Sequence, residues 1–270
     1  MTTTLTPTTP RAATPAPRSA TPPIPFPTVV GVELRKAFDT RSGSWLLASI
    51  VVLSVLATGA AILWAPESMQ NYGTYASAIG MPMSIILPMI AILGVTSEWS
   101  QRTGLTTFTL VPHRGRVIWA KLAVTVGIGV AGMVVALGVG ALGNLVGSTV
   151  AGVDTTWGVT LVEVARIMLA SVLGMLVGFT LGVLFRSSAA AIVGYFVYSL
   201  VLPTISATLA AMQDWFVDIQ PWVDFQLNQT KLYDVDMTGT DWTQLAVTGT
   251  AWLVLPLAFG LWRVVRSEVR

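Results

Sequence analysis

The sequence predicts an all-α polytopic membrane protein with six transmembrane helices and an N-terminal amphipathic helix at the membrane interface. Six stretches of the 270-residue chain carry no charged residue. Each is long enough to be a span, since a helix needs about 20 apolar residues to cross a hydrocarbon core about 30 Å thick. The chain is 53% hydrophobic and 10% charged, with a mean hydropathy of +0.71. Soluble domains carry about 25% charged residues, so composition excludes an ordinary soluble protein.

The N-terminal residues 1–27 are rich in threonine, proline and alanine. They lack the continuous apolar core of a secretory signal peptide. We expect a disordered cytosolic tail, because such a composition cannot bury a core. A docking peptide for a proline-binding partner is the alternative. Residues 28–270 form the predicted transmembrane domain.

Residues 28–41 predict a short amphipathic helix on the inner membrane surface. In helical register Val30, Leu34 and Phe38 share one face, whereas Glu33 and Lys36 fall largely on the other. Basic side chains at this level are attracted to anionic headgroups by about 1 kcal/mol each. The helix acts either as a simple anchor or as a functional element. Its candidate residues are Glu33, Arg35, Lys36, Phe38 and Arg41.

The six spans are predicted at residues 44–64, 79–97, 118–143, 163–184, 189–211 and 244–263. They are expected to be helices, because backbone exposed to lipid must satisfy its own hydrogen bonds. Three glycines on the fourth span are four residues apart and predict a smooth ridge for close packing: Gly174, Gly178 and Gly182. Three prolines are expected either to kink their helices or to serve packing: Pro82, Pro88 and Pro203.

The distribution of basic residues predicts the orientation. With the N-terminus in the cytosol, thirteen of the fifteen lysines and arginines fall on the cytosolic side, and Arg166 and Lys231 are the exceptions. Aspartates are concentrated on the other side. The positive-inside rule then places both termini in the cytosol. A net charge of +2 gives no reason to expect a nucleic-acid partner.

The long outer loop, about residues 212–243, combines aromatic residues with aspartates. Aromatic side chains near span ends gather at the headgroup level, so we expect short helices on the outer interface. A calcium site formed by Asp214, Asp218 and Asp224 is an alternative, since carboxylates bind Ca²⁺. No other metal site is expected, because the chain has no cysteine and one histidine, His113.

The sizeable cytosolic loop between the second and third spans is dense in polar residues and is interrupted by glycine and proline. Basic residues there help to fix the topology, but this does not account for an acid at the end of a span. Lys121, at the foot of the third span, is expected to snorkel toward water. The candidate residues of this loop are Glu98, Arg102, Gly104, Thr106, Pro112, Arg114 and Arg116.

This loop resembles the signature of ABC-2 type transporter permeases. In that family an acid ending span two is followed by a Gly-Thr-rich stretch, a proline and basic residues before a lysine in span three. The matching positions here are Glu98, Arg102, Gly104, Thr106, Leu110, Pro112, Arg114 and Lys121. The segment ELRKAFDTRSGSWLL is similar to the interfacial helix of such permeases, particularly actinobacterial members. The resemblance covers residues about 28–270.

The resemblance implies a permease subunit of an ATP-driven exporter in the cell membrane. Two copies of a separate ABC ATPase and a second permease chain, the same or related, are its implied partners, besides membrane lipid. The loop and the interfacial helix would press into a groove of the ATPase. The chain has no GxxxxGK[ST] phosphate loop, so it is not expected to be an enzyme. It is expected to bind no cofactor, with ATP and Mg²⁺ held by the partner.

Two other functions compete with this interpretation. An ion-coupled transporter or channel places ionisable residues within the membrane, and the predicted spans have none near mid-depth. Glu163 and Arg166 lie at a span end and are expected to pair with each other. A membrane enzyme needs a base near a nucleophile, and His113 lies in the cytosolic loop. The cargo is expected to be amphiphilic or hydrophobic.

Overall fold

A computed structural model describes residues 24–39, 41–100, 114–234 and 236–266, and every regular element in these ranges is a helix. The helices of the N-terminal part are α1 (Phe26–Asp39), α2 (Arg41–Trp64), η1 (Glu67–Met69), α3 (Tyr72–Ser100), α5 (Arg114–Ala151) and α6 (Leu161–Phe185). Those of the C-terminal part are α7 (Ser188–Phe196), η2 (Val197–Val201), α8 (Leu202–Met212), α9 (Asp214–Val223), α10 (Phe225–Asp234), α11 (Gly239–Gly249), η3 (Thr250–Val254) and α12 (Leu255–Arg266).

Six helices in the described residues are long and apolar enough to cross a membrane, which confirms the predicted all-α membrane fold. They span Gly43–Trp64, Tyr72–Ser97, Gly115–Ala151, Leu161–Phe185, Ser188–Met212 and Gly239–Val264. Three of the predicted spans were too short. In the structure the second and the last begin earlier, and the third extends further at both ends. Helix α5 has 38 residues and is therefore about 57 Å long. Its added residues 144–151 contain no charged residue and no proline, so the sequence did not mark the end of this helix.

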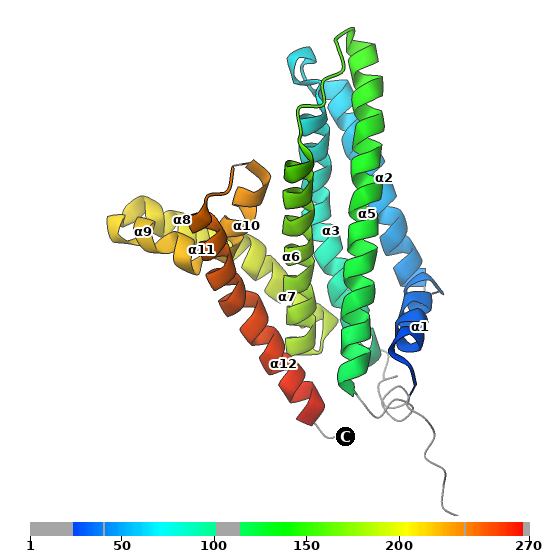
Figure 1. Cartoon of the computed structure of the whole chain (residues 1–270), viewed down its shortest axis with the longest axis vertical. Helices are drawn as coiled ribbons and strands as arrows, with labels where there is room; N and C mark the ends of the chain where they lie inside the picture. The colour runs from blue at the N-terminus through cyan, green and yellow to red at the C-terminus, as the bar shows by residue number, and fades with distance from the viewer. Residues whose placement is uncertain (1–23, 40, 101–113, 235, 267–270) are drawn as a thin grey trace, which may run out of the picture.

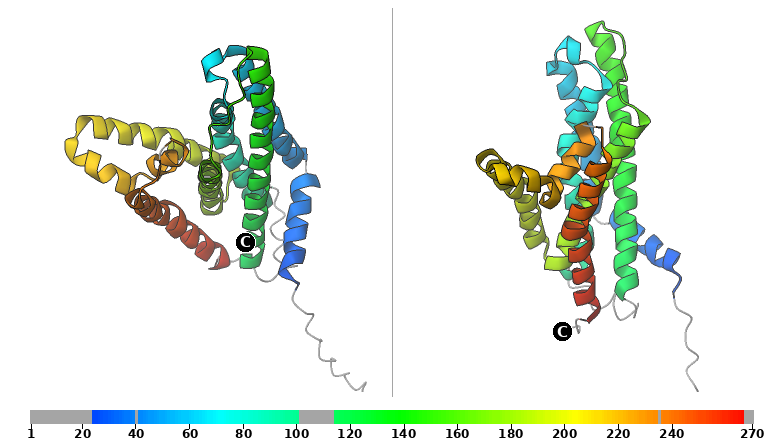
Figure 2. Two further views of the ribbon diagram at one scale, coloured as in Figure 1. Left: turned by 45° about the horizontal axis from the view of Figure 1, so that its top comes forward. Right: turned by 60° about the vertical axis from the view of Figure 1, so that its left-hand side comes forward.

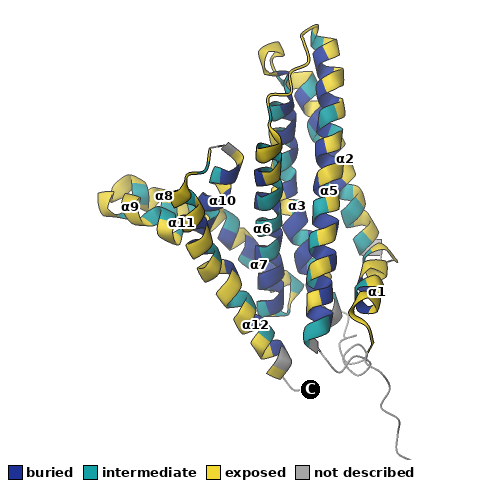
Figure 3. Ribbon diagram, in the orientation of Figure 1, coloured by how far each residue is buried: buried dark blue, intermediate teal, exposed yellow. Residues whose placement is uncertain are grey.

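The long helices α2, α3, α5 and α6 form the main bundle, and α1 lies beside α2 and α5 at one end of it (Figure 1). The last two spans lean away from α6 as a separate pair, which Figure 2 shows from two further sides. One of them is α7, η2 and α8, and the other is α11, η3 and α12. The buried residues line the inner faces of the main bundle, whereas α8 and α9 are largely exposed (Figure 3). The main apolar core is therefore formed by α2, α3, α5 and α6.

The predicted glycine ridge of the fourth span packs against α3. A Cβ atom on Gly178 would lie 2.7 Å from the carbonyl oxygen of Pro88, and one on Gly182 would lie 2.4 Å from Val95 Cγ1. Both distances are too short for a side chain. The two helices make the most extensive contact between helices in the described chain. Pro88 lies inside α3 and contacts this ridge, so it serves packing.

Each of the last two spans contains an interruption of the regular α-helix. The prolines expected to kink helices predicted it in the fifth span but not in the sixth. Each contains a five-residue π-helical turn, η2 or η3, followed by the sequence Leu-Pro at 202–203 or 255–256. The amide of Leu202 donates to the carbonyl of Val197, and that of Leu255 donates to the carbonyl of Thr250, five residues back in both cases. A proline ring would clash with the carbonyl four residues earlier. The wider turn accommodates this clash without ending the helix.

The long loop after the fifth span forms helices, as expected, but they do not both lie on the surface. Helix α9 has no buried residue. Helix α10 packs between α6 and α11 and buries Phe225 and Leu232. Its Asn228 side chain donates to the carbonyl of Pro221 at 2.7 Å. Asn228 also donates to Thr248 of α11 at 3.2 Å, and Gln229 donates to the carbonyl of Ala170 in α6 at 3.4 Å. These bonds and the apolar contacts hold α10 in the bundle, and apolar periodicity alone could not reveal them.

Candidate functional site at the basic end of the bundle

One end of the bundle gathers α1, the end of α3, the start of α5 and the end of α12 (Figure 1). We call it the basic end, because Arg116, Lys121, Arg263 and Arg266 lie there. In α12 the guanidinium of Arg266 lies 4.8 Å from the ring centroid of Trp262. Trp262 is half exposed, as expected for an aromatic residue at a membrane interface.

A buried ion pair joins α1 to α5 at the basic end. Lys121 Nζ lies 2.6 Å from Glu33 Oε2, and the two side chains are 7% and 6% exposed. Lys36 Nζ lies 2.8 Å from the other carboxylate oxygen, Glu33 Oε1. Lys121 also approaches the carbonyl of Gly94 in α3 at 3.5 Å. We call this group the ion-pair junction: Glu33, Lys36, Lys121 and the Gly94 carbonyl.

Apolar residues shield the junction from water, and its lysines keep the Glu33 carboxyl ionised. Val29, Val117 and Ala120 form an apolar cluster between α1 and α5. Burial by itself raises the pKa of the Glu33 carboxyl, but the charges and hydrogen bonds of Lys121 and Lys36 outweigh it, and the pKa falls below its usual value. Removing one partner of a buried pair leaves an uncompensated charge. The junction therefore fixes α1 against the ends of α3 and α5.

Two predictions for this region were wrong. Glu33 was expected on the solvated face of α1, yet it is buried and faces the bundle. Lys121 was expected to snorkel toward water, yet it reaches Glu33 inside the protein. The two residues are 88 positions apart, so helical periodicity in either segment gives no sign of the pair. Leu34 and Phe38 remain exposed, which leaves α1 an apolar face for lipid.

The structure describes only part of the predicted loop site. Arg102, Gly104, Thr106, Leu110 and Pro112 lie outside the described residues. Glu98 belongs to α3 and Arg114 begins α5. Arg116 is partly buried in the first turn of α5. Arg35 and Lys36 are exposed on α1, and Arg41 begins α2. The helices that carry the junction are thus the ones that flank the loop.

At the opposite end, Arg166 is buried and holds the connection that precedes α11. Its Nη2 atom lies 3.3 Å from Asp236 and 3.9 Å from Glu163. The expected pairing with Glu163 is present, and Asp236 is the nearer acid. Glu163 also accepts the backbone amide hydrogen of Thr160 in a capping box at the start of α6. Nearby, Lys231 Nζ pairs with Asp241 at 2.7 Å.

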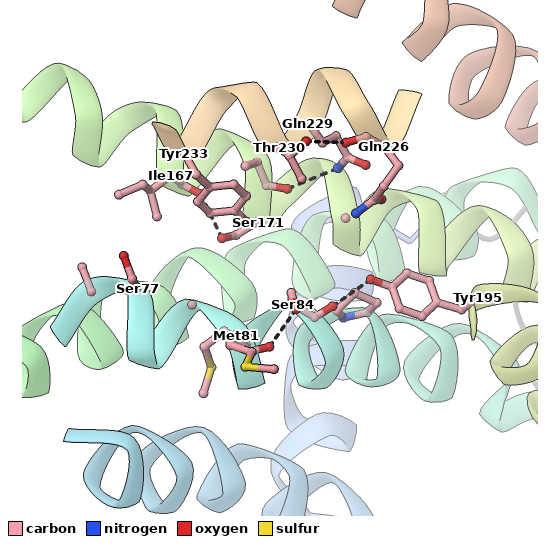
Figure 4. Close-up of a pocket in the computed structure, with 16 residues that line it drawn as sticks. Ser77, Met81, Ser84, Ile167, Ser171, Tyr195, Gln226, Gln229, Thr230 and Tyr233 are labelled. Carbon is pink, nitrogen blue, oxygen red and sulfur yellow. Dashed lines mark hydrogen bonds between the residues drawn. The ribbon is translucent and has the colours of Figure 1, made fainter. Parts of the chain in front are cut away.

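An uncharged cavity of about 330 Å³ lies between α3, α6, α7 and α10 (Figure 4). Tyr195 donates a hydrogen bond to the carbonyl of Ser84 at 2.7 Å. Gln229 accepts one from Tyr198 at 2.6 Å and donates to the carbonyl of Ala170 at 3.4 Å. Sequence reasoning missed this site. The signal available was the group of polar residues Gln226, Gln229 and Thr230 between the fifth and sixth spans.

Comparison with known proteins identifies the family of this chain. No curated protein sequence matches it. A family model described as ABC-2 family transporter protein matches residues 34–202. The match runs from α1 through the first residue of α8. It includes the predicted loop and the Lys36, Gly94 and Lys121 members of the junction, and Glu33 lies one residue before it. The chain is therefore a multi-pass membrane protein that belongs to the ABC-2 transporter family, as the resemblance of the loop between its second and third spans predicted.

Proposed function

We propose that this chain is the permease subunit of an ATP-driven exporter that moves an amphiphilic or hydrophobic substrate across the cell membrane. A separate ABC ATPase, in two copies, binds and hydrolyses ATP with Mg²⁺. Two permease chains, identical or related, assemble around the transport path. Both termini lie in the cytosol, so the basic end faces the ATPase.

The ion-pair junction is the observation that supports this proposal best. An ATPase that presses on a surface helix can move a span only if helix and span are firmly joined. Glu33 joins α1 to Lys121 of α5 at 2.6 Å, and Lys121 reaches α3 at Gly94. The predicted loop connects these same two spans. Force applied to α1 or to the loop would therefore reach α3 and α5 together.

The distribution of charge supports a transporter that is not coupled to an ion. Ion-coupled carriers place acids, lysines or histidines near the middle of the membrane. Within the described spans, Lys121 lies seven residues from the start of α5 and Arg166 five residues from the start of α6. Both are held in ion pairs. The described mid-depth segments rely on apolar packing and uncharged polar groups.

The test is a charge reversal in the predicted loop. The chain is co-expressed with the ABC ATPase that co-purifies with it, and ATP hydrolysis and substrate export are measured in proteoliposomes. The double variant Arg114→Glu and Arg116→Glu should insert normally but lose export that depends on ATP. A second double variant, Arg263→Glu with Arg266→Glu, makes the same charge change elsewhere at the basic end, on α12, and tests whether the effect is specific to the loop. Unchanged export in the loop variant, or an equal loss in both, would remove the proposed coupling role.

A further inference from the structure

The uncharged cavity has two chemically different sides. Helix α10 contributes the polar side chains of Gln226, Gln229, Thr230 and Tyr233. Helices α3 and α6 contribute mainly apolar residues, among them Met83, Pro88, Ile167 and Ala170, together with three serines, Ser77, Ser84 and Ser171. Figure 4 shows the α10 side chains on one side of the cavity and Ser77, Met81 and Ser84 of α3 on the other. A ligand that fills this space needs a polar head and an apolar body.

Nearby charges are kept out of the cavity. The sixteen described residues that line it include no acid and no base. Arg166 precedes the lining residue Ile167, but its side chain pairs with Asp236. Lys231 follows the lining residue Thr230, but its side chain pairs with Asp241. A charged head would therefore enter without a counter-ion, and burying an unpaired charge costs several kcal/mol.

The cavity is partly open, because residues of its lining on α3 and α10 are exposed. Met81 is 77% exposed, and Ser77 and Ser84 are exposed beside it. This α3 segment lies within a membrane span, so the opening admits molecules from the lipid phase. Gly80 lines the cavity, and a Cβ atom there would meet nothing within 4 Å. A volume of about 330 Å³ falls in the usual range for small-ligand pockets, about 300–1,000 Å³.

We propose that this cavity binds the cargo, and that the cargo is an uncharged amphiphile with a hydrogen-bonding head of hydroxyl or amide groups. The head lies under α10, where Gln226 and Gln229 offer amide groups, and the apolar part extends along α3 toward the lipid. This assignment rests on the proposed transport function. A resident lipid of the same chemistry is the competing source of such a ligand.

Photolabelling tests the site. The full-length chain, reconstituted with its ATPase, is labelled with an alkyl glucoside that carries a diazirine in its tail. Probes with the same tail and a sulfate or trimethylammonium head serve as charged counterparts. We expect the glucoside to label peptides of α3 and α10 at least roughly tenfold more than either charged probe, a modest 1.4 kcal/mol in binding. Equal labelling by the charged probes would overturn the proposal.

Two variants connect the labelling to the cavity. Gly80→Leu fills it and should reduce labelling by roughly tenfold, corresponding to about 1.4 kcal/mol. Gly138→Leu is the matched control, because a Cβ at that α5 glycine also meets nothing within 4 Å and the residue is exposed away from the cavity. Gln226→Glu adds a carboxylate and should shift the preference toward the trimethylammonium probe. Wild-type labelling in Gly80→Leu, or unchanged preference in Gln226→Glu, would refute the assignment.

Transport separates cargo from resident lipid. ATP-driven movement of the glucoside should fall in Gly80→Leu as its labelling falls, and remain in Gly138→Leu. If labelling falls but movement does not, the cavity holds a lipid and the cargo assignment fails, while the proposed transport function stands. If no ATPase binds the chain or stimulates movement of any substrate, the proposed function itself fails.

Discussion

The ion-pair junction predicts that Glu33→Gln will release α1 from the bundle. The substitution keeps the shape of the side chain but removes a carboxylate that lies 2.6 Å from Lys121 and 2.8 Å from Lys36. Breaking a buried ion pair by removing one partner costs about 3–5 kcal/mol. We take the lower limit, because the Gly94 carbonyl at 3.5 Å remains as an acceptor for Lys121. At 1.4 kcal/mol per factor of ten, about 3 kcal/mol increases the detached fraction of α1 roughly 100-fold.

Thiol labelling measures this detachment. The natural chain has no cysteine, so a single Val29→Cys reports without background. Val29 is 6% exposed in the apolar cluster between α1 and α5. Its labelling by a maleimide in membranes should accelerate roughly 100-fold when Glu33→Gln is added, if opening precedes labelling.

The control and the refuting results follow from the same contacts. Lys36 is 44% exposed, so Lys36→Gln should change the labelling rate by less than about tenfold, as for a surface ion pair. Glu33→Leu with Lys121→Leu removes both buried charges, and such replacements are often neutral. That double variant should label close to the parent rate. A Glu33→Gln rate equal to the parent rate, or to that of Lys36→Gln, would show that the junction does not hold α1.

Three further predictions concern pH, packing and the opposite end of the bundle. Because the pKa of Glu33 is lowered in the folded protein, its stabilisation is present above the ordinary pKa of about 4.3 and is lost as pH falls through the lower folded value. Spin labels attached beforehand to α1 and α5 should therefore separate only below about pH 4.3, and separation between pH 5 and 8 would contradict this. Gly178→Ala should lower thermal stability by about 1–3 kcal/mol through overpacking against Pro88, whereas Gly127→Ala, with nothing within 4 Å of its Cβ, should not lower it. Arg166→Gln should free the connection around Asp236 and speed its proteolysis, and unchanged cleavage would argue against the 3.3 Å ion pair as its support.

The spans could be predicted from the sequence because a charge within the membrane destabilises the helix that carries it, whatever that helix packs against. All six predicted segments lie within the structural spans, and the largest differences are at the ends of the second, third and sixth. The Gly174, Gly178 and Gly182 ridge was also predictable, since residues four apart share a helix face. The ridge packs closely, as expected, and the structure shows that its partner is α3.

The functional contacts were harder to predict, because they join residues distant in sequence. Glu33 and Lys121 each fit a plain role within their own segment, as a solvated acid and a snorkelling lysine. Their pairing depends on how α1 docks against α5. The cavity likewise depends on α10 turning inward, through polar contacts such as Gln229 with Ala170, 59 positions apart. Sequence patterns within one segment therefore show neither the Glu33–Lys121 pair nor the inward packing of α10.

The π-helical turns η2 and η3 lie beside each other in the last two spans, and each is a point at which its span can bend. The sequence Leu-Val-Leu-Pro occurs in both, at 200–203 and 253–256, and the rings of Tyr198 and Trp252 lie 6.2 Å apart beside it. On the basic side, α12 is anchored to α6 so closely that a Cβ on Gly260 would lie 2.9 Å from Val183 Cγ1. Bending at these turns would move α8, α9 and α11 relative to α6, and α10, which contacts both α6 and α11, would have to shift against one of them. Such a movement would widen or narrow the space that α10 covers without disturbing the contacts that hold α12 in place.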